Sequence, residues 1–125
     1  MNIVLDLETN GFLDKEDLVI HCIVCKDIET HEVYRYNPDN LLDCLDLLKK
    51  TKAIIGHNVL GFDIPVLKKV LGFTYKEKVF DTLLMSRLIW TNLLDHDYKY
   101  KELPAKLYGR HSLEAWGYRC GLRKG

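Results

Sequence analysis

The amino-acid sequence predicts a mixed α/β fold, in which an antiparallel meander is followed by parallel strands and helices flank the sheet. The first three strand-like segments follow one another without a helix between them, and helices then alternate with further strands. The 125 residues, 47% of them hydrophobic and 29% charged, have the size and composition of one globular domain. We therefore expect a single domain over residues 1–125.

The first half of the chain supplies the meander. Residues 1–8 and 18–27 are rich in Ile, Val and Leu, and residues 31–36 alternate between apolar and polar side chains, so all three segments are predicted strands. A helix-start signal, Asn37-Pro38-Asp39-Asn40, comes next. Residues 41–50 then carry apolar side chains at helical spacing.

The second half alternates between strands and helices. Residues 52–56 form a short apolar run that ends in glycine, which predicts a buried fourth strand, and a loop is expected over residues 57–63. Residues 64–73 predict an amphipathic helix, with Pro65 in its first turn and Gly72 at its end. The remaining predicted elements are a strand over 78–82, a helix over 83–90, a loop over 95–110 and a helix over 111–121 that Ser112 is placed to cap.

Charge is unevenly distributed along the chain, although the net charge is zero. Residues 1–46 hold eleven acidic and three basic residues, whereas residues 47–125 hold seven acidic and fifteen basic ones. Either this is an accident of solvated faces, or an acidic site that gathers cations lies beside a surface that tolerates phosphates. No basic footprint for tight duplex binding is present, no apolar run reaches the roughly 18 residues of a membrane span, and no secretory signal is visible. We expect an intracellular protein without a membrane partner.

A Cys-x-x-Cys pattern lies at Cys22 and Cys25, directly after His21. Zinc and redox pairs of this kind normally lie on a turn or a helix start, whereas these residues lie in a predicted strand. We therefore expect buried thiols that pack as small apolar side chains. A structural metal site that uses His21, Cys22 and Cys25 is the alternative.

Two carboxylates, Asp6 and Glu8, end the first predicted strand. Residues two apart in a strand point to the same face, so these like charges lie close together. A divalent cation would remove their repulsion, and magnesium and manganese prefer oxygen ligands of this kind. The alternative is an ordinary exposed strand end.

A second polar stretch follows the predicted fourth strand. His57 and Asn58 lie at its end, and Asp63 precedes the next helix. Ligands of open α/β sheets collect at the carboxyl ends of strands, so Asp63 is a candidate third carboxylate. Its alternative role is a helix N-cap worth about 1 kcal/mol, which is compatible with a metal contact through water. At the next strand–helix junction, we expect Asp81 or Thr82 to cap the helix and brace the neighbouring loop.

Four segments together resemble the 3′–5′ exonuclease domain of family A DNA polymerases, in particular those of T-seven-like phages. In order, the segments are LDLETNG, GHNVLGFDIPVL, FDTLLMSRLI and HSLEAWGYRCG. That domain belongs to the DEDD exonuclease superfamily and has an RNase H-like fold. The resemblance covers nearly the whole chain.

The resemblance implies a metal-dependent reaction and its residues. Asp6 would bridge two divalent cations, Mg²⁺ or Mn²⁺, while Glu8 would hold one of them and Asp63 the other, directly or through water. Two metals held by clustered carboxylates can activate water and stabilise a leaving 3′ oxygen. The residues implied to lie near the terminal nucleotide are Leu7, Thr9, His57, Asn58 and Phe62. For Phe62, a place in the core is the alternative to stacking on a base.

One part of the family pattern is missing. The third motif of the family is Tyr-x-x-x-Asp or a His variant, yet none of the seven tyrosines has an aspartate four residues later. The nearest approach is Tyr98 with Glu102, which precede the HSLEAW segment, whereas the family's motif follows it. The chain is thus expected to be truncated at its C-terminal end, or to be a split gene product, or to be a degenerate domain.

The leading hypothesis is a proofreading exonuclease domain of a phage DNA polymerase. It would release 5′-mononucleotides from a single-stranded 3′ end, with a polymerase domain in cis or in trans, in the cytoplasm of a phage-infected or prophage-carrying bacterium. A non-catalytic RNase H-like module that binds single-stranded DNA or a polymerase partner is the alternative. Ribonuclease activity also stays open, because the superfamily includes ribonucleases.

Overall fold

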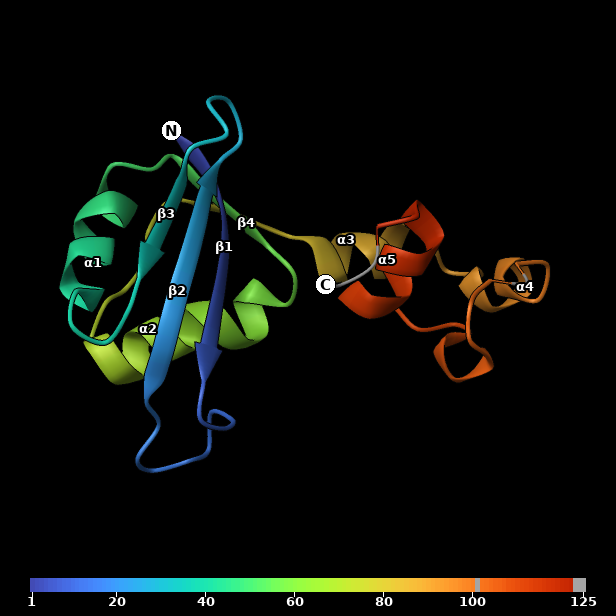
Figure 1. Ribbon diagram of the computed structural model, residues 1–125, viewed down its shortest axis with the longest axis horizontal. Helices are drawn as coiled ribbons and strands as arrows, with labels where there is room; N and C mark the ends of the chain where they lie inside the picture. Colours follow the sequence, from blue (N-terminus) through green and yellow to red (C-terminus); the bar gives the residue numbers. More distant parts are fainter. Residues whose placement is uncertain (101, 123–125) are drawn as a thin grey trace. The chain divides into compact units, whose positions relative to one another are not determined.

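The computed structural model describes residues 1–100 and 102–122 (Figure 1). It divides into two compact units, residues 1–82 and residues 83–125, and each is described by itself. The first unit is an α/β layer structure, and the second is helical. None of the helices in the described part of the chain is long and apolar enough to cross a membrane.

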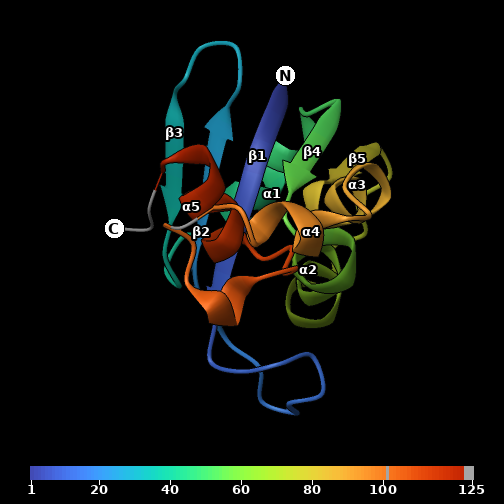
Figure 2. The same cartoon turned by 90° about the vertical axis from the view of Figure 1, so that its right-hand side faces the viewer.

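The first unit is built on a five-stranded mixed sheet with the strand order β3-β2-β1-β4-β5, which can be followed in Figure 2. The strands β1, β2 and β3 form an antiparallel meander, and β4 and β5 then add in parallel to β1. This confirms the predicted fold class. The bounds are β1 Asn2–Thr9, β2 Ile20–Asp27, β3 Val33–Tyr36, β4 Ala53–Gly56 and β5 Lys78–Asp81.

One face of β1 forms the centre of the core. Ile3, Leu5 and Leu7 are buried there and pack with the buried faces of two helices, α1 (Leu41–Lys49) and α2 (Ile64–Leu71). Each such side chain contributes about 1.5–3 kcal/mol by leaving water. The alternating residues of β1 therefore point to the opposite face, which is exposed at Val4, Asp6 and Glu8.

The helix ends follow the predicted signals in part. Pro65 lies in the first turn of α2, and Gly72 ends that helix in the left-handed conformation with φ 66°. The helix α1 begins at Leu41 as expected, but the Asn40 side chain does not cap it. Its Oδ1 instead accepts a hydrogen bond from the Asn37 backbone N–H at 2.7 Å, which closes the preceding turn.

The Cys-x-x-Cys segment lies inside β2, and Cys22 and Cys25 are three residues apart, so their side chains point to opposite faces of the sheet. Cys25 is fully buried beside Cys44 of α1, and its pKa is raised by the hydrogen bond with the Cys44 thiol and by burial. Cys25 packs in the core, as predicted, whereas Cys22 is only partly buried and is not part of the core cluster, so the prediction is wrong for Cys22.

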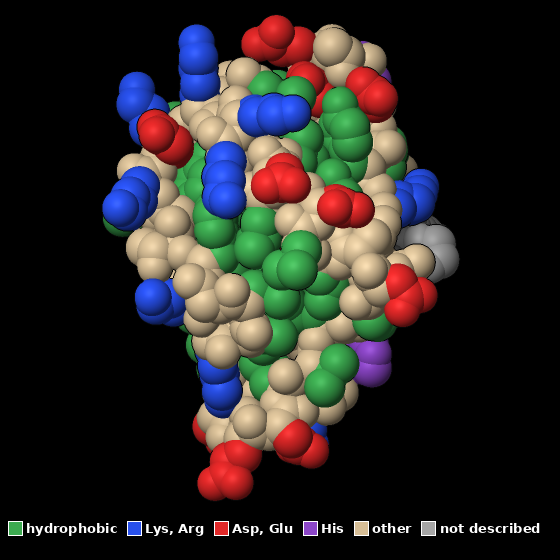
Figure 3. Space-filling view, turned by 90° about the vertical axis from the view of Figure 1, so that its left-hand side faces the viewer, with side chains coloured by type: hydrophobic (Ala, Val, Ile, Leu, Met, Phe, Trp, Pro, Cys, Tyr) green, Lys and Arg blue, Asp and Glu red, His purple; other side chains and the backbone are tan. Residues whose placement is uncertain are grey.

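One face of the molecule is shown in Figure 3. Hydrophobic side chains gather at its centre, most of its Lys and Arg side chains lie towards one edge, and Asp and Glu side chains lie around the hydrophobic centre and partly among the basic ones.

The second unit has three α-helices within its described residues: α3 (Thr82–Ile89, which starts at the last residue of the first unit), α4 (Leu93–Asp97) and α5 (Leu113–Cys120). The predicted loop over 95–110 is wrong in part, since the end of α4 and a short 3₁₀ helix, η2 (Ala105–Leu107), lie within it. Each of these short helices is anchored by one buried leucine, Leu93 in α4 and Leu107 in η2, and single leucines cannot show a helical period in the sequence. The predicted cap of α5 is confirmed, because Ser112 Oγ accepts the Ala115 N–H at 3.2 Å.

Candidate metal centre

The strand β1 presents two carboxylates on one face, as the spacing of the residues predicts. Asp6 lies opposite Val24 of β2 and Glu8 lies opposite Cys22, and both acidic residues are exposed while Leu5 and Leu7 face the core. The register shifts between Glu8 and Thr9, which marks a β-bulge at the end of the pairing. Bulges of this kind redirect side chains at the rims of sheets.

The parallel strand β4 brings the second polar stretch to the same edge of the sheet. It can approach β1 closely at Gly56, where a Cβ atom would lie 3.0 Å from the Leu5 carbonyl oxygen. After this glycine, the chain turns through Asn58, whose φ of 58° is left-handed. The predicted loop over 57–63 is wrong in part, because Val59–Asp63 forms a π-helix, η1, that leads into α2.

Asp63, the last residue of η1, is almost completely buried, and its side chain does not cap α2. The pKa of its carboxyl group is raised to about 7, mainly by burial and also by the negative charges of Asp6 and Asp81. A hydrogen bond with the Leu7 backbone opposes this shift. Asp6 thus lies near enough to Asp63 for its charge to raise the pKa of the Asp63 carboxyl group. A cation between them would remove both the repulsion and part of the cost of burial.

Glu8 shares a face with Asp6 but is exposed at the end of the strand. Within residues 1–100 and 102–122, no three His, Cys, Asp or Glu side chains are already grouped in a way that could hold a metal ion. The donor set itself suits a hard cation, because it consists of carboxylate oxygens. The metal-ligand roles of Asp6, Glu8 and Asp63 therefore remain predictions.

Asp81, at the end of β5, braces the loop beside these carboxylates, as expected from the sequence. One of its oxygens accepts the Asn58 N–H at 2.9 Å, and the other accepts the Leu60 N–H at 3.0 Å. His57 Nδ1 lies 3.0 Å from Thr82 Oγ1 on the neighbouring helix start. Asp81 also adds negative charge near Asp63, because β5 pairs with β4 at this edge of the sheet.

The two hydrogen bonds that Asp81 accepts should be essential for the conformation of the loop at Asn58 and Leu60. We expect Asp81→Ala to lower the free energy of unfolding by about 2 kcal/mol, because two backbone N–H groups lose a charged acceptor that water only partly replaces. Urea unfolding measures the loss. Asp39→Ala, in an exposed turn, is the control, and an equal effect of the two substitutions would contradict the brace.

The raised pKa of Asp63 predicts a dependence of stability on pH. Its folded-state pKa lies above the ordinary value of 3.8, so the carboxyl group favours folding when protonated, and this stability is lost as the pH rises towards 7. Without metal, the wild type should therefore lose about 2–3 kcal/mol relative to Asp63→Asn between pH 5 and pH 8. Urea unfolding of both proteins in EDTA at the two pH values measures this difference. A difference that stays constant with pH would refute the prediction.

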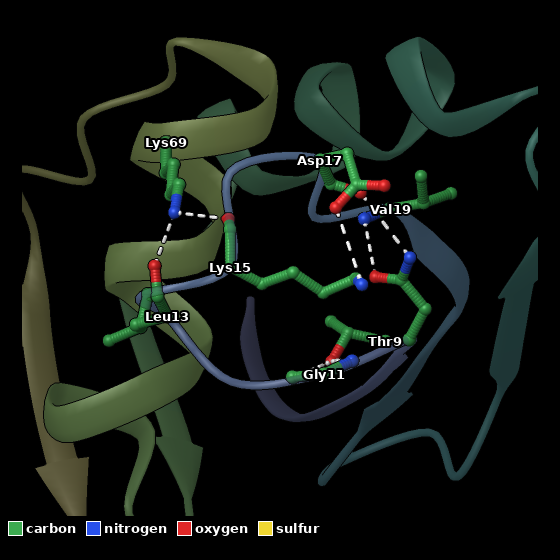
Figure 4. A network of polar contacts seen from close by, with 8 residues as sticks. Thr9, Gly11, Leu13, Lys15, Asp17, Val19 and Lys69 are labelled. Atoms are coloured by element: carbon green, nitrogen blue, oxygen red, sulfur yellow. Dashed lines mark hydrogen bonds and ion pairs between the residues drawn. The ribbon is translucent and has the colours of Figure 1, made fainter.

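The loop after β1 is anchored by a polar network (Figure 4). Asn10 Oδ1 accepts the Val19 N–H at 2.8 Å, and Lys69 of α2 donates to the carbonyl oxygens of Leu13 and Lys15, the latter at 2.6 Å. Thr9 Oγ1 donates to the Gly11 carbonyl oxygen at 2.6 Å. These contacts hold the end of β1, where Glu8 and Thr9 lie, against the first unit.

Other predicted substrate residues occupy mixed positions. The Leu7 side chain is buried in the core, and Phe62 is half-buried and packs against it. Asn58 is exposed, and its side-chain amide lies over Gly61, where any larger residue would overlap it. His57 Nε2 is buried and, among the described residues, has no hydrogen-bond partner. Contact of Leu7, Thr9, His57, Asn58 and Phe62 with a nucleotide stays a prediction.

Comparison with known proteins gives relatives over nearly the whole chain. Across 98% of its length, the chain is 38% identical to the DNA-directed DNA polymerase of Escherichia phage T7 and 37% identical to that of Enterobacteria phage T3. The chain is homologous to part of these phage DNA polymerases. It spans 19% of the length of each phage polymerase.

No protein-family model matches the chain. Among solved structures, it resembles the family B DNA polymerase from the hyperthermophilic archaeon Pyrobaculum calidifontis, with a TM-score of 0.48 and 20% identity over 57% of this chain and 11% of that one.

Proposed function

We propose that the chain is the 3′–5′ exonuclease region of a phage DNA polymerase and proofreads by removing nucleotides from a single-stranded 3′ end. The observation that carries this proposal is the buried Asp63 carboxylate beside Asp6 at the end of β1, with its pKa raised to about 7. A buried carboxylate beside a second negative charge costs free energy unless a cation joins them. The homology to phage DNA polymerases supports DNA as the substrate.

Each carboxylate has a proposed role. Asp6 would contribute to holding both of two divalent cations, Mg²⁺ or Mn²⁺, and Asp63 would hold one of them directly or through water. Glu8 would hold the other, because its exposed side chain shares a face with Asp6. When bound, such a pair of cations supplies an activated water and neutralises charge on the leaving 3′ oxygen.

The surrounding residues have positioning roles in this proposal. The loop held by Asp81 presents Asn58 and His57 to the DNA, and the backbone at Leu7, the Thr9 side chain and the Phe62 ring border the terminal nucleotide. No side-chain nucleophile is needed for this reaction, since a water molecule attacks the terminal phosphorus, the bond from phosphorus to the 3′ oxygen of the remaining strand breaks, and a 5′-mononucleotide is released. We further propose that the region works with a polymerase domain, in cis or in trans, in the bacterial cytoplasm during phage replication.

A second candidate function rests on the missing Tyr-x-x-x-Asp motif. Residues 1–125 contain three of the four carboxylates that the resemblance implies and lack its water-orienting residue. A module of this kind would bind single-stranded DNA, or a polymerase partner, without cutting it.

Product analysis separates the two functions. A single-stranded oligonucleotide labelled at its 5′ end, incubated with the chain and Mn²⁺, should shorten stepwise from its 3′ end and release 5′-mononucleotides. EDTA, or a phosphorothioate at the last linkage, should block the shortening. Binding of the oligonucleotide without any shortening in Mn²⁺ or Mg²⁺ would favour the non-catalytic module.

A further inference from the structure

The second unit contains a hollow of about 200 Å³ that the metal centre does not use. Both tryptophans of the sequence line it, Trp90 at the end of α3 and Trp116 on α5, together with Tyr100. The two indole rings have centroids 6.0 Å apart and are tilted by 58°. Aromatic rings therefore form part of the lining of this space.

A guanidinium group completes the lining. Arg119 lies with its central carbon 4.8 Å from the Trp116 ring centroid, and Asp97 accepts hydrogen bonds from its Nε and Nη2 atoms at 3.0 and 2.7 Å. This pair of contacts fixes the plane of the guanidinium group and neutralises its charge. The hollow therefore suits a neutral flat ring better than a free anion.

The hollow is open to a ligand from solution. Trp90 is 43% exposed, although an indole is among the side chains that gain most from burial. Residues 83–125 also contain eight basic and four acidic residues, and Lys99, Lys106 and Arg110 are exposed. Residues 83–125 thus combine an aromatic hollow with an excess of basic residues, and proteins bind single-stranded nucleic acid with aromatic platforms, on which bases stack, and positive charge, which attracts phosphates.

We propose that this hollow binds one unpaired base of single-stranded DNA, stacked against Trp90. The choice of DNA rests on the proposed function, whereas the preference for a flat neutral ring rests on the lining itself. A dry cavity of about 150 Å³ holds one benzene ring, so this hollow accommodates one ring system rather than a stack of bases.

Tryptophan fluorescence tests the proposal directly, because both tryptophans report from the hollow. In EDTA, which prevents hydrolysis, an eight-residue oligo(dT) should quench the fluorescence of the 125-residue chain. An abasic oligonucleotide of the same length should bind about tenfold more weakly, which is the typical loss for one stacked base. Equal quenching and equal affinity for the two oligonucleotides would overturn the proposal.

Substitutions locate the effect. The binding ratio of oligo(dT) to the abasic oligonucleotide, measured by anisotropy of labelled DNA, should fall from about ten to near one in Trp90→Leu. Leu88→Ala, on α3 two residues before Trp90 and 80% exposed, should keep the ratio of the wild type. A ratio unchanged in Trp90→Leu would overturn the assignment to this hollow. If the wild type shows no Mn²⁺-dependent cleavage but keeps the tenfold binding ratio, only the exonuclease proposal is refuted. The binding ratio is measured without metal, so it tests the hollow independently.

Discussion

Asp6→Asn is expected to reduce the Mn²⁺-dependent release of nucleotides from single-stranded DNA by at least about a hundredfold. The substitution preserves the shape of the side chain but removes the charge that would bridge the two cations. It also relieves the repulsion with Asp63, so the metal-free protein should be at least as stable as the wild type. A gain in stability together with a loss of activity is typical of a functional site and unlike the effect of a structural residue.

The matched control is Asp46→Asn, which removes an exposed carboxylate from α1 and should leave the release rate unchanged. Rates are measured on a 5′-labelled oligonucleotide in Mn²⁺ and in Mg²⁺. Asp6→Asn protein that cleaves at the wild-type rate would place the reaction elsewhere.

Asp97→Ala is expected to destabilise the second unit by about 3–5 kcal/mol, because it leaves the Arg119 charge buried without its partner. Asp97 is only 2% exposed and also accepts the Gly109 N–H at 2.7 Å, so the substitution breaks three hydrogen bonds. Hydrogen exchange of the amides in α4 and α5 measures the loss. Asp95→Ala, exposed on the same helix, is the control and should leave exchange there nearly unchanged.

The same pair predicts a response to acid. Burial by itself raises the pKa of Asp97. The hydrogen bonds from Arg119 and Gly109 and the charge of Arg119 lower the pKa by more than burial raises it, so the net shift is downward. The stability that this carboxylate provides is therefore present above the ordinary carboxyl pKa and is lost as the pH falls through the lowered value. Exchange in α5 that is insensitive to acid in the wild type would contradict this role of Asp97.

The strands and the longer helices could be predicted because their signals are local. Alternation along β1 predicts that Asp6 and Glu8 share a face, and Gly72 and Ser112 mark helix ends through their own backbone and side-chain preferences. These signals depend only on neighbouring residues, so a single sequence contains them.

The elements that the sequence did not predict depend on contacts between residues far apart in the chain. The π-helix η1 begins where Asn58 and Leu60 donate to Asp81, more than twenty residues later. The helix α4 ends at Asp97, which is held by Arg119 of α5. Elements of one or two turns show no period, and the burial that raises the pKa of Asp63 follows only from the packing of η1 against β1.

The central claim is that Asp6 and Asp63 share divalent cations, and direct binding of Mn²⁺ tests it. Free Mn²⁺ gives an electron paramagnetic resonance signal that disappears on binding, so a titration at pH 8 counts the ions bound by each protein. We predict that the wild type binds Mn²⁺ in competition with Mg²⁺, and that Asp6→Asn and Asp63→Asn lose this binding while Asp46→Asn retains it. Mn²⁺ binding that is the same in all four proteins would contradict a metal centre at these carboxylates.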